Sequence, residues 1–141
     1  MTELQAALGL SQMSRLKEFV TTRHRLAKRY DDKLKELPIM LPFQSENTYS
    51  SFHLYVIRLN LDIIEKSHKQ VFQELLDKGV GVNLHYIPVH IHPFYQELGF
   101  KLGDFPEAEK YYGQAISIPL YHGLKDDAQD LVIDAITEIL V

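Results

Sequence analysis

The stretch Phe52-His-Leu-Tyr-Val-Ile-Arg-Leu59 decides the fold, because its aromatic and β-branched content predicts a central strand. Residues 38–51 precede it and are rich in Pro, Ser and Asn, which indicates a loop. The other elements of the chain are therefore expected to pack around residues 52–59.

One long helix is expected before this strand, over residues 2–37. Its apolar residues recur at three- and four-residue steps, and Pro38 ends the pattern. The opposite side carries eight Lys and Arg side chains and is interpreted as a solvated basic face. The small residues of Ala6–Gly9 leave room for a neighbouring backbone, so the helix should pack on another element. Because Met1 leaves almost no room for a cap, we expect a longer parent protein.

A second helix is expected after the strand, with Asp62 as its N-cap, Lys78 near its end and Gly79 as its C-terminal stop. Residues 80–85 should then resume extended structure. The side chains of this helix that are expected to point inward are Ile63, Ile64, Val71, Phe72, Leu75 and Leu76.

The last third of the chain predicts a helix that starts at Pro106, a short strand over residues 115–120 and an amphipathic helix over residues 125–140. Glu107 and Glu109 fall in the first turn of the helix at Pro106, where acidic residues are favourable. The side chains expected to point inward from the final helix are Leu131, Val132, Ile133, Ala135, Ile136 and Ile139.

These elements predict an α+β fold, in which a small sheet of about three strands is covered by helices and preceded by a long leading helix. We expect residues 1–141 to form a single domain, with the leading helix over 1–37 and an α+β body over 52–141.

The composition excludes several classes of protein. The net charge of −4 gives no basic field that would attract nucleic acid. The absence of cysteine excludes disulfides, thiolate nucleophiles and zinc-thiolate sites. The apolar runs fall short of the ~20 residues that cross a bilayer, and no leader pattern is present. We therefore expect a cytoplasmic protein that binds neither nucleic acid nor membrane.

The most informative stretch for function is Gly79–Tyr95, which contains three His, two Tyr, one Phe and two Pro. Pro88 and Pro93 restrict the backbone and hold the preceding residues in extended angles. The pattern predicts a non-helical segment suited to a pocket wall. The alternative is a buried crossover loop whose histidines only satisfy backbone groups.

His85, His90 and His92 could also form a metal site, because His90 and His92 alternate along an extended backbone and would face the same way. No Asp or Glu lies among them to complete the ligand set, so contacts to substrate hydroxyls or phosphates fit better and no metal is expected. No Gly-rich phosphate loop and no nucleophilic serine motif is present.

Four blocks of the sequence, Met1–Gln12, Gly79–Tyr95, Phe105–Glu109 and Ile116–Tyr121, resemble the C-terminal part of the DegT/DnrJ/StrS nucleotide-sugar aminotransferases. The blocks occur in the order and with the spacing of the family, and the resemblance runs almost from end to end.

The resemblance implies a pyridoxal-phosphate enzyme of the aspartate aminotransferase fold. Such an enzyme works as a homodimer and moves an amino group from glutamate to a UDP-keto-deoxysugar in surface polysaccharide or glycan synthesis. Its cofactor lysine would lie upstream of Met1, so the chain would be the C-terminal small domain without the large cofactor domain. We expect no bound cofactor, no catalytic residue and no activity of this chain alone.

By the same resemblance, His85, Tyr86 and His90 should contact the sugar nucleotide, with His92, Tyr95 and Tyr121 as weaker candidates. Imidazole and phenol groups can donate to hydroxyl and phosphate oxygens while their rings cover the sugar.

Two other interpretations stay open: a stand-alone ligand-binding or assembly module, and a histidine-based metal protein. Without a large domain, an apolar patch around Leu4, Ala7, Leu8 and Leu10 would be exposed and could drive non-native self-association.

Overall fold

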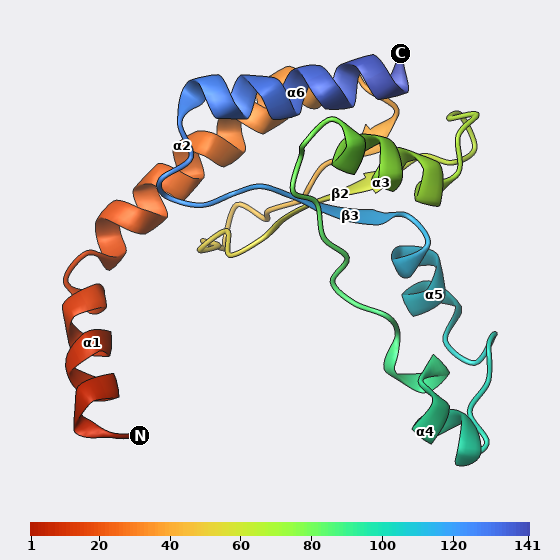
Figure 1. The fold of residues 1–141 in the computed structure, drawn as a ribbon, viewed down its shortest axis with the longest axis horizontal. Helices are drawn as coiled ribbons and strands as arrows, with labels where there is room; N and C mark the ends of the chain where they lie inside the picture. Colours follow the sequence, from red (N-terminus) through yellow and green to blue (C-terminus); the bar gives the residue numbers. More distant parts are fainter.

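The computed structural model describes residues 1–141 and has an α+β architecture (Figure 1). Its elements follow in the order α1 (Glu3–Met13), α2 (Leu16–Leu34), β1 (Ile39–Met40), β2 (Tyr55–Leu59), α3 (His68–Asp77), the 3-10 helix η1 (Val89–Ile91), α4 (Pro93–Glu97), α5 (Pro106–Tyr112), β3 (Ala115–Ile118) and α6 (Asp126–Leu140).

The sheet has three antiparallel strands in the order β1-β2-β3, so β2 is the central strand, as predicted. The first strand, β1, was expected to be part of a loop. Residues 80–85, which were expected to be extended, contribute only an isolated bridge between Asn83 and Ser117. Asn83 and Ser117 exchange two backbone hydrogen bonds at this bridge, and the side chain of Asn83 accepts a further one from the backbone N–H of Leu84.

The prediction of one leading helix was wrong, because α1 and α2 are separate helices (Figure 1). Ser14 donates its hydroxyl hydrogen to a carbonyl one turn earlier, and Arg15 adopts φ −102° and ψ 0°, which breaks the helical path. The expectation that no cap fits was also wrong, because Thr2 and Gln5 form a capping box. No residue of α1 is buried, so the structure shows no element packed on it.

The helix after the central strand begins later than predicted. Asp62 lies in a turn, and Ser67 is the N-cap of α3, in a capping box with Gln70. Ile63 in that turn is 66% exposed and Leu76 in α3 is 41% exposed, so these two do not point inward as expected. Gly79 follows α3 with φ +79°, a conformation that glycine adopts easily, and ends the helix as predicted.

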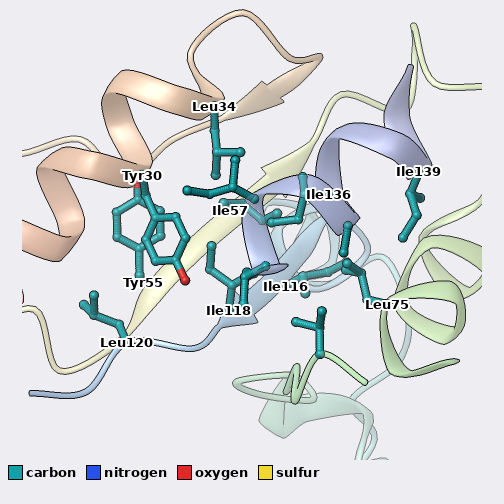
Figure 2. Packing of buried hydrophobic residues seen from close by; sticks show 14 of the residues in the cluster. Tyr30, Leu34, Tyr55, Ile57, Leu75, Ile116, Ile118, Leu120, Ile136 and Ile139 are labelled. Atoms are coloured by element: carbon teal, nitrogen blue, oxygen red, sulfur yellow. The ribbon is translucent and has the colours of Figure 1, made fainter. Parts of the chain in front are cut away.

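The core lies between the sheet and the helices α2, α3 and α6 (Figure 2). Tyr55, Ile57 and Leu59 alternate along β2 and point into this core. The predicted inner face of α6 is confirmed for five of its residues, Val132, Ile133, Ala135, Ile136 and Ile139. Leu131 is 70% exposed and is an exception.

Ion pairs join α2 to α6 beside the core. Arg25 lies 2.8 Å from Asp126, and Arg29 lies 2.6 Å from Asp130. The basic face of the leading segment was interpreted as solvated, but these two arginines face another helix. None of the helices combines the length and the apolar character that crossing a membrane requires.

A section that we call the arm, residues 88–112, projects from the body and contains η1, α4 and α5 (Figure 1). The prediction of a non-helical run over residues 79–95 was therefore wrong from Val89 onward. Pro93 is the first residue of α4 and Pro106 the first of α5, where a missing N–H costs nothing. The start of α5 at Pro106 confirms the prediction.

Candidate functional site

His85 is held by the sheet. Its Nδ1 atom lies 2.8 Å from Oγ of Ser117, a residue of β3 that is only 5% exposed. Along a strand successive side chains point to opposite faces, so Ser117 points away from the core that receives Ile116 and Ile118. The His85 ring is thereby fixed on the face of the sheet opposite to α2 and α6.

Tyr86 is 75% exposed, more than the other two predicted tyrosines, Tyr95 and Tyr121. The peptide bond between His85 and Tyr86 is cis, and the two rings are nearly perpendicular, at 86°, with centroids 4.7 Å apart. The phenol of Tyr86 is accessible to a ligand.

His90 is buried and paired with an acid. Its Nε2 atom lies 2.8 Å from Oε1 of Glu109 on α5. The same oxygen accepts hydrogen bonds from the backbone N–H groups of Gly103 at 2.8 Å and Phe105 at 3.4 Å. Partial burial acts to raise the pKa of Glu109, but the hydrogen bonds from Gly103, His90 and Phe105 outweigh it and hold this pKa below its ordinary value.

Sequence reasoning missed Glu109 as a partner of the histidines. It assigned Glu109 to the favourable first turn of its helix and noted no acid among His85, His90 and His92. The pairing spans 19 residues of sequence, and the spacing carries no signal for it. Only the packing of α5 against η1 brings the two side chains together.

His92 does not face the same way as His90. It is exposed, and its Nε2 atom lies 3.4 Å from the carbonyl oxygen of Ile87. The expected alternation requires an extended backbone, whereas His90 lies in the 3-10 helix η1. The structure brings together no group of three or more His, Asp and Glu side chains in an arrangement that could hold a metal ion.

Tyr95 belongs to an aromatic cluster in the arm. Its ring centroid lies 5.4 Å from that of Phe94 and 6.4 Å from that of Phe100, and His90 lies 4.8 Å from Phe105. A cavity of about 310 Å³ opens in this cluster. It is lined by Pro88, Val89, His90, Tyr95, Phe100, Phe105 and Ala108. The structure therefore brings His90 and Tyr95 to one apolar cavity.

Tyr121 borders a different cavity. It is 51% exposed and lines a groove of about 730 Å³ between α6 and Gly79–Gly81. None of the other predicted site residues lines this groove. The six predicted residues thus fall into three groups: the sheet-bound His85 with Tyr86, the arm residues His90, His92 and Tyr95, and the separate Tyr121.

The comparisons with known proteins agree with one another. The DegT/DnrJ/EryC1/StrS aminotransferase family is matched over residues 1–137. The spore coat polysaccharide biosynthesis protein SpsC of Bacillus subtilis is 38% identical over 143 residues, which cover 99% of this chain and 37% of that protein.

Solved structures show the same relationship. The putative sugar aminotransferase Spr1654 of Streptococcus pneumoniae, in its apo form, superposes with a TM-score of 0.91 at 29% identity and covers 99% of this chain. DesV of S. venezuelae, in complex with a ketimine intermediate, gives a TM-score of 0.89 at 29% identity and covers 98% of this chain. The matched region is 35% of the Spr1654 chain and 36% of the DesV chain, so this chain spans about a third of the length of its relatives.

Proposed function

This chain belongs to the DegT/DnrJ/EryC1/StrS aminotransferase family, and from that premise we propose that it is the sugar-nucleotide-binding small domain of a pyridoxal-phosphate-dependent aminotransferase. The parent enzyme would transfer an amino group from glutamate to a UDP-keto-deoxysugar, for surface polysaccharide or glycan synthesis. It would have the aspartate aminotransferase fold and act as a homodimer, with residues 1–141 as its C-terminal small domain. The observation that carries this proposal is the family match over residues 1–137.

The geometry around His85 and Tyr86 supports a role in ligand contact. Ser117 engages Nδ1 of His85 and leaves Nε2 as the second polar atom of the ring. The exposed Tyr86 phenol is a donor and an acceptor beside it. An imidazole nitrogen and a phenol oxygen can bond hydroxyl and phosphate oxygens, while the two perpendicular rings cover apolar faces of a sugar.

We propose that pyridoxal phosphate is not attached covalently to this chain. That cofactor stabilises carbanions once a lysine amine has anchored it. No lysine lines the aromatic cavity of the arm, and the ammonium groups of Lys66 and Lys78 lie 2.7 and 2.8 Å from Glu74 and Glu138. The proposal therefore assigns no catalytic residue to residues 1–141 and places the cofactor in another part of the parent.

Binding of UDP-N-acetylglucosamine to the 141-residue chain, measured by NMR titration, tests the ligand-binding part of the proposal. Tyr86→Phe should weaken binding roughly three- to tenfold, because one hydrogen bond is lost. Tyr49→Phe is the matched control, since Tyr49 is 73% exposed and lies outside the site, and its binding should equal that of the unsubstituted chain. The absence of saturable binding would contradict the proposal.

Borohydride trapping tests the cofactor part. After incubation with pyridoxal phosphate and reduction, we expect no stoichiometric adduct at a single lysine among the ten in the chain. A stoichiometric adduct at one lysine would show that this chain can anchor the cofactor by itself. Sequencing the DNA upstream of Met1 separates the alternatives: an in-frame extension with a cofactor lysine supports an aminotransferase parent, and a genuine start at Met1 supports a stand-alone binding module.

A further inference from the structure

Glu109 joins three segments of the arm at one carboxylate oxygen. Oε1 accepts from Nε2 of His90 in η1, from the N–H of Gly103 in the following loop and from the N–H of Phe105 at the start of α5. Phe105 is the N-cap residue of α5, and its side chain cannot accept a hydrogen bond. Glu109 accepts from the N–H of Phe105, which is one of the donors that the start of a helix leaves without a partner. This side chain therefore bridges η1, the loop at Gly103 and α5.

The pairing fixes which nitrogen of His90 carries hydrogen. An ionised carboxylate only accepts hydrogen bonds, so Nε2 of His90 must donate to Glu109. The two side chains are 7% and 18% exposed, which shields the bond from competing water. Nε2 is thus committed to Glu109 and is not free to contact a ligand.

The exposed residues before η1 lie between two such attachments. His85 is bound to Ser117 of β3 at one end, and His90 is bound to Glu109 of α5 at the other. Between them Tyr86 is 75% exposed. Pro88, with φ −55° and ψ 133°, restricts the connecting backbone. Movement of η1 would be transmitted to Tyr86 through this short, stiff connection.

We propose that Glu109 is a positioning residue for the ligand-binding segment: through His90 it holds η1 against α5 and so presents the Tyr86 phenol to a sugar nucleotide in one orientation. This inference rests on the proposed function for the identity of the ligand. The dependence of the Tyr86 orientation on Glu109 can be measured in the ligand-free chain and does not require that function.

The test compares Glu109→Gln with Glu107→Gln, an exposed residue of the same helix turn, in the 141-residue chain. Glutamine keeps an oxygen that can accept from Gly103, Phe105 and His90, but it removes the charge that strengthens the hydrogen bond from His90. Without ligand, Glu109→Gln should shift the NMR signals of the Tyr86 ring and accelerate exchange of the Nε2 hydrogen of His90. With UDP-N-acetylglucosamine, its Kd should rise about tenfold, and that of Glu107→Gln should stay unchanged.

Each outcome has a distinct meaning. Unshifted Tyr86 signals and an unchanged Kd in Glu109→Gln would overturn the positioning role while the proposed function stands. Failure of the unsubstituted chain to bind UDP-N-acetylglucosamine would overturn the proposed function and the ligand named here. The ligand-free spectra would still decide whether the orientation of Tyr86 depends on Glu109. If Glu109→Gln does not fold, His90→Phe keeps an aromatic ring at this position and removes the donor. It should show the same tenfold loss, and unchanged binding would again overturn the inference.

Discussion

The Nδ1 atom of His85 lies 2.8 Å from Oγ of Ser117, and this contact attaches the segment of residues 85–90 to β3. Ser117 is almost fully buried although its side chain points away from the core. A buried hydroxyl needs a partner, and His85 provides it. The same contact therefore stabilises the sheet face and orients a residue that we expect to meet the ligand.

Ser117→Ala should lower the stability of the fold and weaken ligand binding. The loss of the hydrogen bond should lower the free energy of unfolding by about 1 kcal/mol, measured by urea denaturation. It should also weaken UDP-N-acetylglucosamine binding, because the His85 ring is released. Ser51→Ala, at an exposed position, serves as the control. Equal stability of the two variants would show that the contact contributes nothing.

Tyr55→Phe should reduce the sensitivity of the fold to alkali. Burial, and then the hydrogen bond to Asp31, raise the pKa of Tyr55 well above its ordinary value of 10.0. The unfolded chain ionises at the ordinary value, so the stabilisation is complete below about pH 10 and is lost as the pH rises further.

Thermal unfolding between about pH 9 and about pH 11 measures this effect. The Tyr55→Phe variant has no ionisable group at position 55, so its stability should fall less steeply as the pH rises. Part of the alkaline loss should remain, because burial also raises the pKa of Tyr30. Tyr49→Phe should keep the steep fall of the unsubstituted chain, and an equally steep fall in Tyr55→Phe would be the contrary result.

Ile136→Ala should be far more damaging than Leu131→Ala on the same helix. Ile136 is 1% exposed in the core, so its truncation should leave a cavity and cost about 2–5 kcal/mol of unfolding free energy. Leu131 is 70% exposed, and its truncation should change stability by less than about 0.5 kcal/mol. Chemical denaturation of both variants checks the difference, and similar losses would refute the assignment of the inner face of α6.

Asp126→Asn should reduce the loss of stability in acid. The hydrogen bond from Arg25 lowers the pKa of Asp126 below its ordinary value of 3.8, and this effect exceeds the opposing effect of burial. A carboxylate with a lowered pKa stabilises the fold above its ordinary pKa, and the contribution is lost as the pH falls through the pKa in the folded state.

Denaturation between about pH 5 and about pH 2 measures the effect, with Asp134→Asn on the same helix as the control. Asp126→Asn should be less stable at the upper end of this range and should lose less stability on acidification. An acid dependence identical to that of the control would be evidence against the Arg25–Asp126 pair.

The sequence by itself determined the elements whose signals are local. Aromatic and β-branched residues gave the central strand β2 at Tyr55–Leu59, Pro106 marked the start of α5, and apolar periodicity located α6 with most of its inner face. Propensity and periodicity act through neighbours within one or two turns, so they can be seen in a single stretch of chain.

Only the tertiary structure decided the small strand β1 and the partners of the histidines. The sequence placed His90 and His92 on one side, but the fold buries His90 and leaves His92 exposed. Ser117 lies 32 residues from His85, and Glu109 lies 19 residues from His90. Such contacts arise because packing brings distant segments together, and no spacing within the Gly79–Tyr95 stretch encodes them.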